Sequence, residues 1–169
     1  MKGLGGLFVV LDSDFLSSFL KIGKLDLVRS FYQVSHLQIP PAVFREVSQT
    51  PLLERLAQTP WLEVTVPGSQ GLPGVAPQVG RHELGAGELE AIALALEHPN
   101  SLLLMSDNRA RHEAIRNGAQ VVNIPAFLLA CKISGFLDRE EIAAIIRDLE
   151  EKDRYSFRQE VLTRLLTET

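Results

Sequence analysis

Cysteine is almost absent from this sequence, and long apolar runs are absent altogether. The single cysteine among 169 residues, Cys131, excludes an internal disulfide and a cysteine-rich metal site. No apolar stretch approaches the ~18 residues that a transmembrane helix needs, so we expect no association with a membrane. The apolar run near the amino terminus is short and is interrupted by Asp12, which argues against a secretory signal. Together these absences predict a cytoplasmic globular protein.

Positive charge is also sparse. The sequence has 17 lysines and arginines against 21 acidic residues, a net charge of −4, and it has no polybasic tail. Binding to nucleic acid by counterion release alone is therefore excluded, and any such contact must be local or mediated by metal ions. The four histidines lack the spacing of metal ligands. Neither a Gly-Lys-Ser/Thr phosphate loop nor a Gly-x-Ser-x-Gly nucleophile turn is present.

The order of apolar runs and amphipathic segments predicts a parallel sheet flanked by helices. Residues 7–11 and 102–105 are apolar throughout, as in strands that are buried on both faces. Shorter strands are expected at 36–39, 61–66 and 120–124, and helices at 14–20, 25–31, 42–49, 52–57, 109–117 and 125–135, with one more beginning at Gly85. We expect one domain over residues 1–169, with residues 138–169 as a C-terminal helical extension packed on it.

Local signals add detail to this prediction. Phe44 is expected to face the core together with Val43 and Val47. Capping boxes are expected where Asp138 precedes Glu141 and where Ser156 precedes Gln159. The proline- and glycine-rich stretch 67–80 is expected to be a long loop, and loops of that length usually have a function or are mobile.

Four acidic residues occupy positions that favour a shared site. Asp12 and Asp107 follow apolar strands, so both should emerge at the carboxyl edge of the sheet, where open α/β sheets bind ligands. Glu88 lies in the first turn of a helix after two glycines, and Glu46 lies on a helix beside Arg45. Each has an ordinary alternative, since acids commonly cap helices or lie on solvated helix faces. Carboxylates that converge need a cation, and oxygen ligands suit Mg²⁺ or Mn²⁺.

Four segments, taken in order, resemble a PIN domain. Residues 7–16 and 39–47 are similar to the opening of such a domain. Residues 84–95, with their Gly-Ala-Gly-Glu sequence, resemble the central helix motif of the branch that contains VapC-type toxins. Residues 103–111 resemble the late acidic motif, and residues 118–122 resemble the strand that follows it. The resemblance implies a three-layer α/β/α fold with a central, mostly parallel sheet.

The resemblance also implies an activity, namely a metal-dependent endoribonuclease that uses Mg²⁺ or Mn²⁺. The matching acidic positions are Asp12, Glu46, Glu88 and Asp107. Asp12, Glu88 and Asp107 would hold the metal, with Asp14 as an extra ligand in a place more often taken by a small polar residue. Many relatives have an acid where this chain has Ser106, a departure that would weaken metal binding. Arg45, Arg109 and Arg111 would bind flanking phosphates, although solvated helix charges explain each of them equally well.

Other functions are compatible with the same residues. An apolar strand that ends in Asp-x-Asp also resembles the haloacid-dehalogenase-like phosphatases, in which Asp12 would be the nucleophile and Asp14 the acid/base. The missing acid at position 106 would also fit a catalytically weak module that binds nucleic acid or protein. For a toxin-like nuclease, the expected partners are the RNA substrate, a small antitoxin protein and a second copy of the chain in a homodimer.

Overall fold

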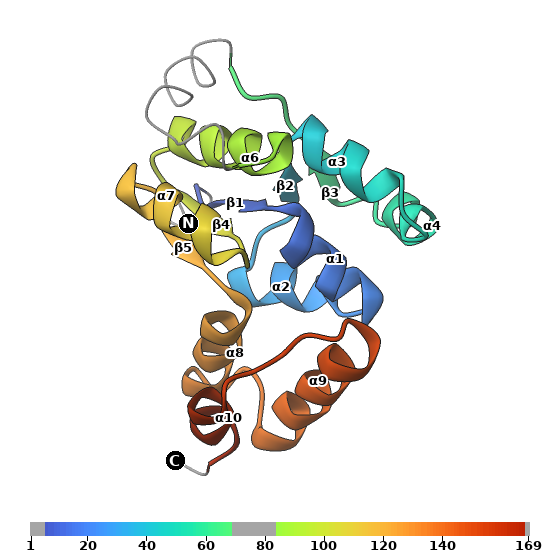
Figure 1. The fold of residues 1–169 in the computed structure, drawn as a ribbon, viewed down its shortest axis with the longest axis vertical. Helices are drawn as coiled ribbons and strands as arrows, with labels where there is room; N and C mark the ends of the chain where they lie inside the picture. Colours follow the sequence, from blue (N-terminus) through green and yellow to red (C-terminus); the bar gives the residue numbers. More distant parts are fainter. Residues whose placement is uncertain (1–5, 69–83, 168–169) are drawn as a thin grey trace.

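The computed structural model of the chain describes residues 6–68 and 84–167. Its centre is a sheet of five strands in the order β3-β2-β1-β4-β5, and every pair of neighbours is parallel (Figure 1). The strands are β1 (Phe8–Leu11), β2 (Leu37–Ile39), β3 (Leu62–Val64), β4 (Ser101–Leu104) and β5 (Val121–Val122). The parallel sheet predicted from sequence is thus confirmed. In the structure, β1 lies at the middle of this sheet. The predicted strands 61–66 and 120–124 are shorter than expected.

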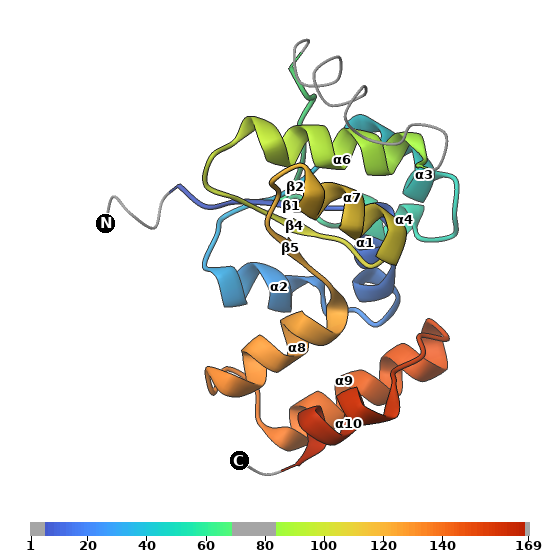
Figure 2. The same ribbon diagram turned by 60° about the vertical axis from the view of Figure 1, so that its left-hand side comes forward.

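Helices cover both faces of the sheet and form the outer layers of a three-layer α/β/α fold. The first part of the chain contains α1 (Ser13–Lys21), α2 (Leu25–Tyr32), α3 (Pro41–Ser48) and α4 (Leu53–Ala57). The second part contains α6 (Ala86–Glu97), α7 (Asn108–Arg116), α8 (Ile124–Ile133), α9 (Arg139–Lys152) and α10 (Gln159–Leu166). In Figure 2, α6 lies above the sheet, whereas α2 and α8 lie below it.

Successive side chains of β1 point to opposite faces of the sheet, so they contribute to two separate hydrophobic clusters. Val9 and Leu11 point into the larger hydrophobic cluster, which includes α1, α2, α8 and α9. Val10 points the other way, into a smaller cluster formed mainly by α6 and α7. This division follows from the two-residue period of a β-strand, and it explains why the strand has no polar position until Asp12.

The C-terminal helices pack below the sheet in both views (Figures 1 and 2). α9 lies against α1, where Ser18 Oγ and Lys21 Nζ donate hydrogen bonds of 2.6 and 2.8 Å to the Asp153 carboxylate. α10 packs against both α8 and α9. No helix in residues 6–68 and 84–167 combines the length and the apolar character needed to cross a membrane.

Several local predictions can be compared with the structure. The Asp138–Glu141 capping box is confirmed, with hydrogen bonds of 2.8 and 2.9 Å between the two residues. The Ser156–Gln159 box is wrong, because α10 begins after Arg158 and has no side-chain cap. Phe44 is 39% exposed, since it lies one residue beyond the buried stripe of α3. Most of the predicted loop 67–80 lies outside the described residues.

Candidate active site at the carboxyl edge of the sheet

Asp12 and Asp107 follow neighbouring strands that end at the same level. Leu11 is paired with Leu104 in the register of β1 and β4, and the Asp12 backbone N–H donates a 3.0 Å hydrogen bond to the Leu104 carbonyl. The chain after β4 therefore passes beside Asp12 before it reaches Asp107. Parallel strands with a common end create a crevice at that edge.

Asp12 is a buried carboxylate that also caps a helix. It is 1% exposed, and one of its oxygens accepts a 2.9 Å hydrogen bond from the Phe15 N–H in the first turn of α1. Burial raises the pKa of Asp12 to about 8, and the negative charges of Asp14, Glu88 and Asp107 add to this effect against the capping hydrogen bond. Asp12 can therefore both cap α1 and belong to a shared acidic site. The capping hydrogen bond fixes the position of its carboxylate.

Glu88 approaches the same edge from the other layer. It lies in the first turn of α6, where the Gly85 N–H donates a 3.1 Å hydrogen bond to Glu88 Oε1. Partial burial raises the pKa of Glu88, and the negative charges of Asp107, Asp14 and Glu46 raise it further. The α6 turn therefore holds one oxygen of the Glu88 carboxylate in place.

Glu46 reaches this cluster because α3 packs closely against α6. Ser13 Oγ donates a 2.9 Å hydrogen bond to Glu46 Oε2. A Cβ atom added to Gly87 would collide with Glu46 Oε1 and would lie 3.3 Å from Ser13 Oγ. Glycine at position 87 thus makes room for the Glu46 carboxylate at the start of α6. Sequence placed Glu46 on a helix but could not place it beside Glu88.

Asp14 completes the acidic group, which we call the acidic edge: Asp12, Asp14, Glu46, Glu88 and Asp107. Asp14 lies in the first turn of α1, and its pKa is raised by partial burial and then by the charges of Asp107, Glu46 and Asp153, with Lys21 opposing. In residues 6–68 and 84–167, none of the five forms an ion pair. The acidic edge is consequently a cluster of carboxyl groups without a salt-bridge partner in the described part of the chain.

The acidic edge offers only oxygen ligands to a metal ion. Within the described part of the chain, no three Asp, Glu, His or Cys side chains are close enough, as they stand, to enclose an ion. The donor set nevertheless fits Mg²⁺ or Mn²⁺, since both prefer carboxylate oxygens and Mg²⁺ usually keeps several water ligands in place of a full protein cage. The pKa values of three of the five carboxyls are raised by burial and by the neighbouring negative charges, an effect that a bound cation would oppose.

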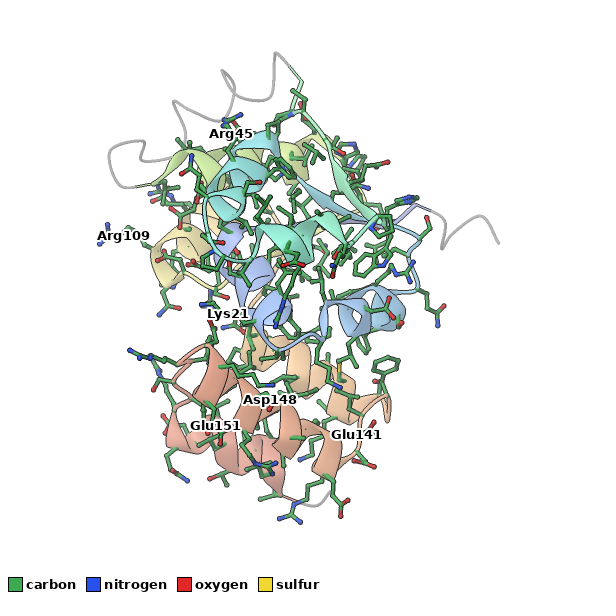
Figure 3. All side chains as sticks on the ribbon, turned by 90° about the vertical axis from the view of Figure 1, so that its right-hand side faces the viewer. Lys21, Arg45, Arg109, Glu141, Asp148 and Glu151 are labelled. Atoms are coloured by element: carbon green, nitrogen blue, oxygen red, sulfur yellow. The ribbon has the colours of Figure 1, made fainter. Side chains whose placement is uncertain are left out.

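The three arginines predicted to bind phosphate differ in their surroundings. Arg109 extends from α7 into solvent, and Arg45 lies on the outer side of α3 (Figure 3). The Arg45 guanidinium is 3.9 Å from the Glu90 carboxylate, so its charge is partly compensated. Arg111 is half-buried, and its Nε has no hydrogen-bond partner among the described residues. Of the three, Arg111 is the one that has a buried donor without a partner in the described ranges.

Sequence interpretation missed the segment between α9 and α10. Tyr155, Phe157 and Arg158 line a cavity together with Ser106 and Arg111, next to the acidic edge. The signal was a pair of aromatic residues between two basic ones in the sequence from Arg154 to Arg158, a combination typical of single-stranded nucleic-acid binding. From sequence, residues 138–169 are expected only to form a helical extension packed on the domain, with no role for this segment in a site.

Comparison with known families now adds to this geometry. A family model described as a PIN domain matches residues 8–169. The chain belongs to the PIN-domain family. A search of curated proteins gives no match for it. PIN domains are generally nucleases and typically use divalent metals, so membership of the family supports a hydrolase.

Proposed function

We propose that this PIN domain is a metal-dependent endoribonuclease that hydrolyses RNA phosphodiester bonds at the acidic edge. The observation that carries the proposal is the gathering of five carboxyl groups, the buried Asp12 among them, without a single ion pair in the described ranges. Acidic groups clustered without a cationic partner destabilise a fold, and such clusters with perturbed pKa values are typical of functional sites. The family match favours a nuclease over the phosphatase alternative.

The residues of the acidic edge would have two different roles. Asp12, Glu88, Asp107 and Asp14 would hold Mg²⁺ or Mn²⁺. The bound metal would neutralise the phosphoryl group and lower the pKa of an attacking water. Capping of α1 keeps the Asp12 carboxylate in one position, and the Gly85 N–H does the same for Glu88. Glu46, which accepts a hydrogen bond from Ser13, would accept a proton from a water at the same edge.

The test compares two substrates. Labelled RNA and a small phosphomonoester are incubated with the protein, with and without Mn²⁺. We expect RNA cleavage that requires Mn²⁺, that is lost in Asp12→Asn, and that is retained in Asp138→Asn. Asp138 is a matched control because it caps α9 as Asp12 caps α1, but it is exposed. Phosphomonoesterase activity that depends on Asp12 while RNA stays intact would refute the nuclease.

The resemblance to VapC-type toxins suggests a biological role within this proposal. A toxin of a type II toxin–antitoxin pair would act in the cytoplasm, would be held inactive by a small antitoxin and would often be a homodimer. The support for these points is the motif at residues 84–95, where the Gly-Ala-Gly-Glu sequence opens α6. Growth arrest on expression of the wild type, but not of Asp12→Asn, is the expected result. Normal growth at equal protein levels would contradict the toxin role.

A further inference from the structure

A cavity of about 390 Å³ lies beside the acidic edge, at the junction between the PIN core and the C-terminal helices. Ser106 and Asn108, which flank Asp107, line one side of it. The segment that joins α9 to α10 lines the other side, where it returns across the molecule toward α8 (Figure 1). The volume is within the range of small-ligand sites, which begins at about 300 Å³.

The cavity is positively charged, in contrast to the acidic edge. Its lining includes Arg111 and Arg158 and no carboxylate. Neither arginine forms an ion pair in the parts of the chain that the structure describes. The Ser106 Oγ and Arg111 Nε atoms are buried and have no hydrogen-bond partner there. Buried donors without partners are rare, so these two atoms favour a hydrogen-bond acceptor that comes from outside the chain.

Three helices begin at the same cavity. Asn108 is the first residue of α7, Asn123 is the N-cap of α8, and Arg158 is the N-cap of α10. The amino-terminal end of a helix carries a partial positive charge and free N–H groups, which together favour an anion. In α10 no side chain occupies the cap, so its first N–H groups have no side-chain acceptor. The ends of α7 and α8 are already capped by the Asp107 carboxylate and the Asn123 side chain. Two arginines and the uncapped end of α10 thus favour a phosphate.

Aromatic rings form the remaining part of the lining. The Tyr155 and Phe157 rings pack against each other with their centroids 4.7 Å apart, and both side chains are half-buried. Aromatic faces beside cationic groups are typical of sites that bind unpaired nucleotides, because the base stacks on the ring and its phosphate contacts the cation. Burial keeps the Tyr155 hydroxyl neutral by raising its pKa, despite the opposing charge of Arg111.

We propose that this cavity is a nucleotide subsite that holds one residue of single-stranded RNA next to the phosphodiester that is cut. Arg111 and Arg158 bind its phosphate, and Tyr155 and Phe157 contact its base. Because Ser106 and Asn108 flank Asp107, an occupant of the cavity adjoins the acidic edge. The subsite rests on the proposed nuclease function for its role, but its binding of RNA can be measured separately.

The experiment measures affinity and cleavage in parallel. A fluorescent single-stranded RNA of mixed sequence is titrated by anisotropy with Ca²⁺ present to neutralise the carboxylates, and cleavage of the same RNA is followed with Mn²⁺. Arg111→Gln and Arg158→Gln are compared with Arg147→Gln, which removes an equal charge from an exposed position on α9. Thermal melting confirms that each variant is folded.

We expect each subsite variant to weaken RNA binding about tenfold, as the loss of a charge-assisted contact does, and Arg147→Gln to leave it unchanged. In cleavage, the subsite variants should raise KM while kcat stays near the wild-type value. RNA carrying 4-thiouridine should crosslink to residues 155–158. Crosslinks that map only elsewhere would overturn the subsite.

The outcomes separate the two proposals. Wild-type protein that cleaves RNA, with both arginine variants equal to it in affinity and KM, would overturn the subsite and leave the nuclease intact. Binding that depends on Arg111 and Arg158 without cleavage under any divalent metal would support the subsite and refute the nuclease. Absence of RNA binding by the folded wild type, or binding of inorganic phosphate alone, would overturn the subsite.

Discussion

Replacing Asp12 by asparagine should stabilise the metal-free protein. The carboxylate is 1% exposed, and burial raises its pKa from 3.8 to about 8. In the unfolded chain the same group ionises near its ordinary pKa, so at neutral pH folding must either protonate it or bury its charge. Asparagine has no charge to bury, and as an N-cap it is about as good as aspartate, so the hydrogen bond from the Phe15 N–H is retained.

The magnitude follows from the separation of the two pKa values. Stability from this group is fully present below its unfolded pKa and is lost as the pH rises through the folded pKa. The loss approaches ~1.4 kcal/mol per pH unit, so at pH 7, about three units above the unfolded pKa, it reaches at most ~4 kcal/mol. Relaxation around the buried charge reduces this, and we expect a gain of roughly 2–4 kcal/mol for Asp12→Asn. For a chain of this size that is an increase in Tm of roughly 5–15 °C.

The assay is thermal and denaturant unfolding in EDTA from pH 5 to pH 8. Wild-type stability should fall across this range, whereas Asp12→Asn should be flatter and the two should converge toward pH 4. Asp138→Asn, which changes an exposed cap on α9, should behave as the wild type. If Asp12→Asn were no more stable than the wild type at pH 7.5, the burial of an uncompensated charge at Asp12 would be refuted.

Three further results are expected. Gly87→Ala should leave the free energy of unfolding unchanged or raise it by up to ~1 kcal/mol, because alanine is favoured in helices. The same change should reduce RNA cleavage, because the added methyl group displaces the Glu46 carboxylate. Undiminished cleavage would exclude a role for the observed position of Glu46. Ser18→Ala should reduce the free energy of unfolding by about 1–2 kcal/mol through loss of the hydrogen bond to Asp153, measured in urea. Mn²⁺ at one hundred times its Kd should raise wild-type stability by about 2.7 kcal/mol and should have little effect on Asp12→Asn.

Much of the fold could be predicted from sequence because its strands are short apolar runs with clear ends. Asp12 and Asp107 could be placed from sequence because each of them follows such a run. The carboxyl ends of parallel strands lie at one edge of the sheet, so both acids are expected there. Glu88 was found from its place in the first turn of α6. These positions depend on local sequence and on one rule of topology.

The remaining parts of the site depend on contacts between distant segments. Glu46 reaches the acidic edge only because α3 packs on α6 at Gly87, forty-one positions along the chain, and no local pattern encodes that contact. Arg158 and Arg111 line one cavity because α9 and α10 fold back under the sheet. The wrong prediction of a capping box at Ser156 has a similar origin. The capping pattern is present in the sequence, but residues 155–158 line the cavity and α10 begins only after Arg158.

Calorimetric titration of Mn²⁺ into the metal-free protein tests the central claim most directly, since the acidic edge must bind a divalent cation if it is the catalytic centre. We predict saturable binding to the wild type and to Asp138→Asn at pH 7.5, loss of that binding in Asp12→Asn, and RNA cleavage that rises with the same Mn²⁺ dependence. Absence of saturable Mn²⁺ binding to the wild type, or binding that Asp12→Asn leaves unchanged, would contradict the assignment of the acidic edge as a metal-dependent nuclease centre.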